Sequence, residues 1–195
     1  MSAVLENPIT ELMTADELLM MPNSRWGYEL VRGKLKKYMP AGNLHGFIAS
    51  RVGRIIGNFV DEHNLGAVFA AETGFYIFQN PDTVRAPDSA FVGNEKLAKY
   101  GISKGYFPDA PDLAVEVVSP NDKKKDVEDK IQDYLKAGVK LIWIIYPQKQ
   151  FVAVYRQSKI VSILFETDEL EGEDVIPNFR LPLEKVFVNL PQIEE

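Results

Sequence analysis

The chain has 195 residues, of which 46% are hydrophobic and 26% charged, and this composition fits a globular protein with one well-buried core. It contains no cysteine, which excludes a disulfide framework and a thiolate metal site and is compatible with a reducing compartment. No apolar run approaches the ~20 residues of a membrane span. The first residues carry Glu6 and Glu11 and lack a signal-peptide pattern, so we expect a cytoplasmic protein without a membrane partner.

The net charge of −6 argues at first against a nucleic-acid partner. The acids are concentrated at one end, because residues 160–195 hold nine Asp or Glu and two Lys or Arg, a net of −7 that leaves +1 for residues 1–159. Basic residues cluster at 34–37, 51–54 and 123–125. Such clusters are more often solvated faces than binding sites, so the charge pattern permits nucleic acid without indicating it.

The N-terminal part predicts two helices around a hairpin. Residues 14–17 (TADE) before an apolar run predict a short capped helix that ends before Pro22. Residues 28–31 and 34–39 predict a β-hairpin that turns at Arg32 and Gly33. A helix is predicted from Asn43 to about His63, with apolar residues spaced at three and four, so one face must lie against a sheet.

Small residues recur along the same helix at Gly46, Ser50, Gly53 and Gly57. We expect this line on the side of the helix opposite to the apolar stripe, where it would allow another element to approach closely. That element is either the N-terminal segment or a second subunit, and the line is the basis for expecting a symmetric homodimer.

The rest of the chain alternates predicted strands with one more long helix. Strands are predicted at 67–78 and 84–92, a loop with a helical turn at 93–110, and a strand buried on both faces at 113–118. A helix follows from Ser119 to Gly138, then a buried strand at 139–146 and a closing hairpin at 151–156 and 160–165. Without repeats or linkers, the sequence predicts a single α/β domain over residues 1–195.

Two acids interrupt apolar strands, Asp88 after residues 84–87 and Glu116 within 113–118. A buried carboxylate without a partner is costly, so it usually has a cation, a proton or a metal ion. Two acids on adjacent strands beside a lysine-bearing helix suit Mg²⁺, whose retained water can attack a phosphodiester. The alternative is that each acid pairs with an arginine or caps a loop. Asp112 is excluded as a third ligand, since four residues of strand separate it from Glu116 by roughly 13 Å at ~3.3 Å per residue.

The ordered motifs of this chain resemble one family. The motifs are Pro87-Asp88, the run PDLAVEVVSP at 111–120, Lys130, the run YLKAGV at 134–139, YELVRG at 28–33 and His45-Gly46. Together they strongly resemble the Uma-two restriction endonucleases of the PD-(D/E)XK superfamily. The resemblance implies a restriction-endonuclease-like core of helix, three strands, helix and strand, with an extra N-terminal hairpin and C-terminal strands. It also implies Asp88 and Glu116 as ligands of Mg²⁺ or Mn²⁺ and DNA as the substrate.

The superfamily pattern places a lysine where this chain has Val118. The resemblance implies that the lysine has moved to the following helix, at Lys130, with Lys123 one heptad earlier as its rival. Glu29 and His45 are further candidates for the active site. Their alternative interpretations are an exposed strand acid and a satisfied core histidine.

The leading hypothesis is therefore a Mg²⁺-dependent endonuclease that hydrolyses DNA. The alternative is a catalytically silent nuclease fold that binds DNA or a protein, which Val118 and the acidic C-terminal segment favour. A glycosidase with Asp88 and Glu116 as its carboxylates is a third possibility that no other sequence feature supports. Trp26 and Tyr28 could stack on bases, although core aromatic residues are commoner.

Overall fold

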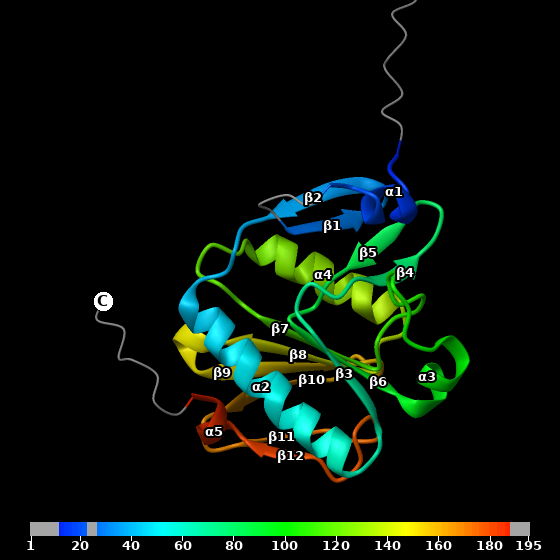
Figure 1. The fold of residues 1–195 in the computed structure, drawn as a ribbon. Coiled ribbons are helices and arrows are strands. Elements are labelled where there is room, and N and C mark those ends of the chain that lie inside the picture. Colours follow the sequence, from blue (N-terminus) through cyan, green and yellow to red (C-terminus); the bar gives the residue numbers. More distant parts are fainter. Residues whose placement is uncertain (1–11, 23–26, 188–195) are drawn as a thin grey trace, which may run out of the picture.

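The computed structural model describes residues 12–22 and 27–187, so Trp26 lies outside the described residues. Figure 1 shows four layers. A small sheet lies over helix α4 (Lys124–Lys136), α4 covers one face of a larger sheet, and helix α2 (Asn43–Glu62) covers the other face. Within the described residues no helix is long and apolar enough to cross a membrane.

The small sheet contains the predicted hairpin. Its strand order is β2-β1-β5-β4, and the bounds are β1 Gly27–Val31, β2 Lys34–Tyr38, β4 Phe75–Phe78 and β5 Thr83–Arg85. The hairpin turns at Arg32 and Gly33, both with positive φ. The short helix α1 (Ala15–Leu19) has the predicted capping box between Thr14 and Glu17 and packs on this sheet.

The larger sheet forms the centre of the fold. Among the described residues its strand order is β10-β9-β8-β7-β6-β3. The bounds are β3 Gly66–Ala70, β6 Ser89–Gly93, β7 Leu113–Val117, β8 Leu141–Tyr146, β9 Phe151–Arg156 and β10 Val161–Phe165. Strands β7 and β8 are parallel and α4 connects them, while the other pairs are antiparallel. The order α2, β3, β6, β7, α4, β8 reproduces the expected helix, three strands, helix and strand.

The remaining elements pack at the margins of this core. They are α3 (Asn94–Tyr100), the 3-10 turn η1 (Pro147–Lys149), β11 (Glu169–Glu171), β12 (Arg180–Pro182) and α5 (Leu183–Phe187). Leu170, Leu181 and Leu183 of the last three elements pack with α2 in the main hydrophobic core.

Strand alternation in β7 separates two cores. Val115 and Val117 belong to the core under α2, whereas Ala114 belongs to the core under α4 with Ile131 and Tyr134. Since successive side chains point to opposite faces, Glu116 lies on the α4 side.

The prediction of continuous strands at 67–78 and 84–92 is wrong. Both segments cross between the sheets, since β3 and β6 belong to the larger sheet and β4 and β5 to the small one. The second crossing falls at residues 86–88, where Pro87 has no N–H to donate to a ladder. Asp88 therefore lies in a bend just before β6, not in the middle of a strand.

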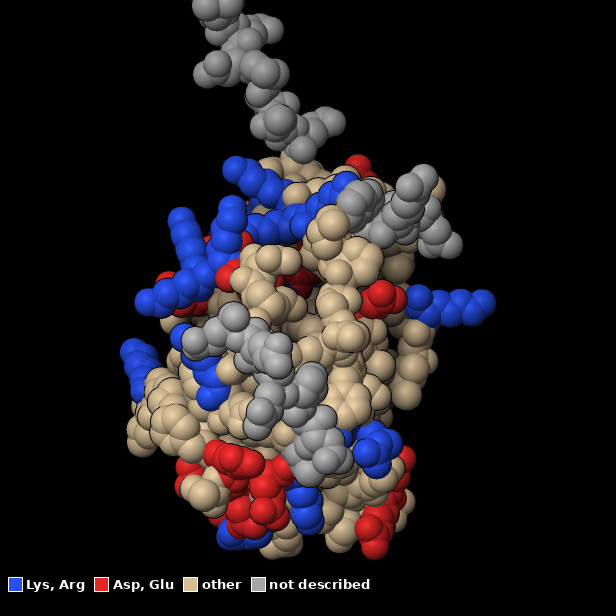
Figure 2. All heavy atoms as spheres, turned by 90° about the vertical axis from the view of Figure 1, so that its left-hand side faces the viewer, with Lys and Arg blue, Asp and Glu red and all other residues tan. Residues whose placement is uncertain are grey.

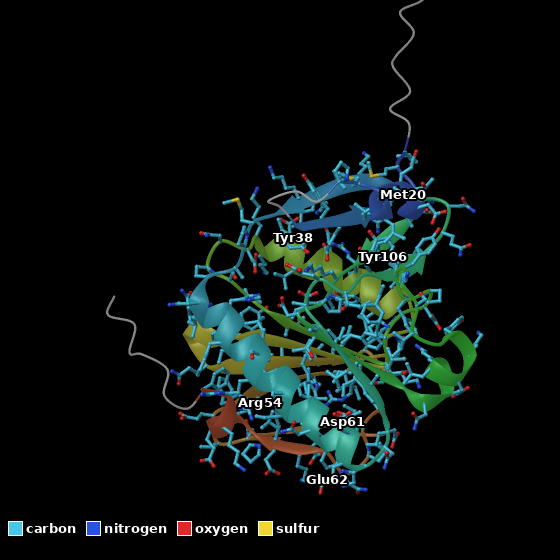
Figure 3. All side chains as sticks on the ribbon, in the orientation of Figure 1. Met20, Tyr38, Arg54, Asp61, Glu62 and Tyr106 are labelled. Carbon is cyan, nitrogen blue, oxygen red and sulfur yellow. The ribbon has the colours of Figure 1, made fainter. Side chains whose placement is uncertain are left out.

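The predicted direction of the small-residue line is wrong for Gly53 and Gly57, whereas Gly46 and Ser50 are exposed. A Cβ atom on Gly53 would lie 3.2 Å from Ser89 Oγ, and one on Gly57 would lie 4.0 Å from Val68 Cβ. These glycines thus face β6 and β3 of the same chain and allow α2 to approach the sheet. Figure 3 shows Arg54, Asp61 and Glu62, all exposed, along α2.

Two other glycines, Gly66 of β3 and Gly46 of α2, test how closely backbone segments approach in this fold. A Cβ on Gly66 would lie 2.1 Å from the Val92 carbonyl oxygen, so Gly66→Ala must displace backbone and should lower the free energy of unfolding by about 1–3 kcal/mol. Gly46 is helical and has no such atom within 4 Å, so Gly46→Ala should raise it by about 0.5–1 kcal/mol. Urea unfolding of both variants measures these changes, and equal effects would contradict the packing described.

Candidate active site

Asp88 and Glu116 lie side by side on neighbouring chain segments. Strands β6 and β7 are antiparallel with Ser89 opposite Val115, so continuing the register by one residue places Asp88 opposite Glu116. Asp88 Oδ2 accepts a hydrogen bond from the Val117 backbone N–H at 2.7 Å. This bond fixes the Asp88 carboxylate against the strand that carries Glu116.

His45 approaches Asp88 from the first turn of α2. Its Nε2 lies 3.1 Å from Asp88 Oδ2. Burial opposes a charge on the imidazole, but the hydrogen bond to Asp88 and the charge of that carboxylate outweigh it, so the pKa of His45 is raised. The histidine is therefore a partner of Asp88 rather than a residue of the apolar core.

Glu116 has partners on both carboxylate oxygens, and both come from α4. Lys130 Nζ lies 2.9 Å from Oε2, and the Tyr134 hydroxyl donates to Oε1 at 2.6 Å. Lys130 and Tyr134 are one helical turn apart and so present both donors to the same acid. Burial opposes the Lys130 ammonium, but Glu116 and Glu29 outweigh it and raise the pKa of Lys130.

The pKa of Glu116 is raised, mainly because the side chain is buried. Burial raises the pKa of Glu116 to about 7, and the negative charges of Asp88 and Glu29 act in the same direction, while Lys130 and Tyr134 oppose them. A cation placed beside Asp88 and Glu116 would favour the ionised form.

Glu29 is buried, not exposed, and belongs to a network beneath the site. Its Oε1 lies 3.4 Å from Lys130 Nζ and its Oε2 accepts a hydrogen bond from Arg85 Nη1 at 2.8 Å. Burial would raise the pKa of Glu29, but Lys130 and Arg85 outweigh it and lower that pKa. Arg85 also donates to Asp133 of α4, so one arginine joins β1, β5 and the helix.

The site opens on the face shown in Figure 2. Glu116, Val118 and Lys130 line a small cavity of about 60 Å³ that also reaches Asp122 and Asp126. In Figure 2 acidic atoms lie at the bottom of a hollow, and Lys and Arg side chains gather above it and to its left. Exposed lysines at 34, 37 and 123–125 belong to β2 and the start of α4, and Lys36 of β2 pairs with Asp126 of α4 at 3.0 Å.

The side chains at this site offer the oxygen ligands that a hard divalent cation prefers. In the described part of the chain no three His, Cys, Asp or Glu side chains converge into a complete metal site. Mg²⁺, however, keeps several waters and commonly takes one or two protein carboxylates. Asp88 and Glu116 are two such oxygen ligands. Asp112 is turned away from them, because its carboxylate accepts from the Gly93 N–H and pairs with Lys140.

Three residues of the site, Arg85, Asp133 and Tyr134, were not predicted from the sequence. Tyr134 had a usable signal, since it lies four residues after Lys130 on one helix face. Arg85 pairs with Glu29 and Asp133, which lie far from it in the chain, so no local sequence signal predicted this pairing. The rival Lys123 is exposed at the N-cap of α4.

Tyr38 of β2, labelled in Figure 3, also lies near the site and was not predicted. Burial raises the pKa of Tyr38, and the charges of Glu29 and Asp88 contribute to this shift.

The raised pKa of Glu116 predicts a pH-dependent stability. Because this pKa of about 7 exceeds the ordinary value of 4.5, the folded state binds more protons between these pH values. The free energy of unfolding should therefore fall as pH rises through that window. Glu116→Gln removes this titrating group. The free energy of unfolding of the variant, relative to that of the wild type, should therefore increase from pH 5 to pH 8 by up to about 3 kcal/mol.

Urea unfolding in chelator-containing buffer measures this difference. Glu128→Gln, an exposed position on the same helix, is the control and should show little change with pH. An equal stability difference for Glu116→Gln at both pH values would contradict the prediction.

Comparison with known proteins agrees with this fold. The Uma2 family, described as "Putative restriction endonuclease", matches residues 15–184. A crystal structure of a putative nuclease of DUF820 from Anabaena variabilis superimposes with a TM-score of 0.76 at 24% identity, covering 90% of this chain and 97% of that one. The curated proteins searched include no match. Since the family match extends over most of the 195 residues, the chain belongs to the Uma2 family of restriction-endonuclease-like proteins.

Proposed function

We propose that this protein is a metal-dependent endonuclease that hydrolyses phosphodiester bonds of DNA, and that residues 1–195 form one nuclease domain. Family membership supports a nuclease. The observation that carries the proposal is the position of Lys130 Nζ, 2.9 Å from Glu116, while Asp88 accepts from the N–H of the neighbouring Val117. Two carboxylates and a lysine supply the ligands and the cation that cleavage of a phosphodiester needs.

Asp88 and Glu116 would hold Mg²⁺ or Mn²⁺. When bound, such an ion acidifies a coordinated water and stabilises charge on the phosphate. His45 and the Val117 N–H both contact Asp88 Oδ2 and so orient this carboxylate. Tyr134 orients Glu116 in the same way through Oε1.

Lys130 would act on the phosphate itself. Its side chain is a quarter exposed, so the ammonium is held by Glu116 and Glu29 but still borders the cavity. An incoming phosphate oxygen would compete with Glu116 for the ammonium and gain a charge-assisted hydrogen bond. Glu29 would keep Lys130 in place during this exchange, which makes Glu29 a positioning residue.

The lysines around the opening would bind the DNA backbone. Lys and Arg side chains gather above the hollow in Figure 2 and to its left, and β2 and the start of α4 carry exposed lysines. Asp and Glu side chains gather lower on the same face. This separation of charge would direct a polyanion toward the site despite the net charge of −6.

The role of Lys130 gives the test of this proposal. Lys130→Met should lower the rate of plasmid cleavage in Mg²⁺ by ~10²–10³, because a charge contact made in the transition state is lost. Metal binding, followed by calorimetry, should persist, because Asp88 and Glu116 are unchanged. Lys123→Met, at the exposed start of the same helix, is the matched control and should cleave nearly as the wild type does.

Two outcomes would contradict the proposal in different ways. Loss of cleavage in Lys123→Met but not in Lys130→Met would show that the wrong lysine was assigned. A wild-type protein that cleaves neither plasmid nor single-stranded DNA with Mg²⁺ or Mn²⁺ would favour the alternative, a silent nuclease fold that binds DNA or protein.

A further inference from the structure

Strand β10 forms an open edge of the larger sheet. In the part of the chain that the structure describes, it is hydrogen-bonded to β9 and is the last strand in the order. Alternate backbone N–H and C=O groups of an edge strand point away from the sheet, where another strand can pair with them.

One face of this edge strand is apolar and exposed. Val161, Ile163 and Phe165 alternate along β10, and their exposed fractions are 48%, 48% and 57%. The face continues inward, because the rings of Phe165 and Phe151 lie 6.3 Å apart and Phe151 stacks on Tyr146 at 4.4 Å. Residues of this kind are usually kept off an open edge, since they invite association.

We propose that two copies of this chain associate through β10, by antiparallel pairing of the strand with itself about a twofold axis at Ile163. The Phe165 N–H and C=O already pair with Asp168 of the same chain. The new hydrogen bonds would therefore form at Ile163 in the centre of the strand, and the pairing joins the two larger sheets. It places Val161 of one copy opposite Phe165 of the other, and Ile163 opposite Ile163. All three pairs are apolar, as cross-strand neighbours on one face should be.

The charges at the ends of β10 fit a second copy of the same strand. Exposed Lys159 precedes the strand and exposed Glu166 follows it. In an antiparallel self-pairing about Ile163 the start of one strand lies beside the end of the other. Each Lys159 therefore lies near the partner's Glu166, one position from the residue directly opposite. The strand is therefore complementary to itself in backbone, side chains and charge. This inference does not depend on nuclease activity, and it replaces the small-residue line of α2 as the basis for a homodimer.

Cysteine substitution tests the register directly, because the chain has no cysteine of its own. Across the axis the two Ile163 Cα atoms would be about 4.5–5.5 Å apart, within disulfide range. Ile163→Cys should therefore yield a covalent dimer under mild oxidation. Ser162→Cys should not, because its symmetry mate is displaced by two residues, beyond the ~7 Å limit. Ile102→Cys, at an isoleucine that is 73% exposed outside β10, is the second control.

Charge substitutions test the interface in solution. Analytical ultracentrifugation of the full chain should show a dimer of the wild type and of Ile102→Lys, and a monomer of Ile163→Lys, in which two like charges face each other. Lys159→Glu should raise the dissociation constant about fivefold, and adding Glu166→Lys should restore it. Retained thermal unfolding of Ile163→Lys will show that the variant folds. A wild-type monomer at ~100 µM, a dimer of Ile163→Lys, or equal cross-linking at 102 and 163 would overturn the proposal.

Discussion

The geometry of the site depends on the neutralisation of buried charge. Arg85 is 1% exposed and lies between two buried acids, Glu29 on β1 and Asp133 on α4. Burying a charge costs several kcal/mol unless partners compensate it, and removing one partner leaves the others uncompensated. Lys130 extends the network by pairing with Glu29 on one side and Glu116 on the other. The same contacts that make burial tolerable thus fix α4 between the two sheets.

This network gives the N-terminal hairpin a function within the fold. The hairpin supplies Glu29, and through Arg85 it is tied to β5, whose chain continues directly into Pro87 and Asp88. Lys36 on the next strand reaches Asp126 at the start of α4. The small sheet therefore holds both the carboxylate segment and the lysine helix, and it contributes basic residues around the opening.

Local patterns predicted much of the fold, because periodicity and capping are encoded by neighbouring residues. The capped helix α1, the hairpin, the apolar stripe of α2 and the buried strands β7 and β8 all follow from such signals. The strands at 67–78 and 84–92 were predicted incorrectly, because the hydrophobic pattern changes little where the chain passes from one sheet to the other. The main sequence signal of such a crossing is Pro87. The direction of Gly53 and Gly57 was predicted incorrectly, because a glycine indicates that another element approaches closely but does not indicate which element it is.

The site itself was predictable where an acid interrupted an apolar strand, as with Glu116. The proximity of His45 to Asp88 and of Glu29 to Lys130 could not be derived in this way, because these pairs join segments far apart in the chain. Neither Arg85 nor Asp133 stands out in the local sequence of its strand or helix, so their contact could be found only from the fold.

The most direct test of this account is to locate a bound metal ion. Crystals soaked in Mn²⁺ should give an anomalous difference peak between the carboxylates of Asp88 and Glu116, with ligand distances of about 2.1 Å. Lys130 should remain beside Glu29. If Mn²⁺ instead occupies only the acidic pocket lined by Asp168, Glu169, Glu171 and Glu173, and Glu116 keeps its contacts to Lys130 and Tyr134, the assignment of Asp88 and Glu116 as metal ligands is contradicted.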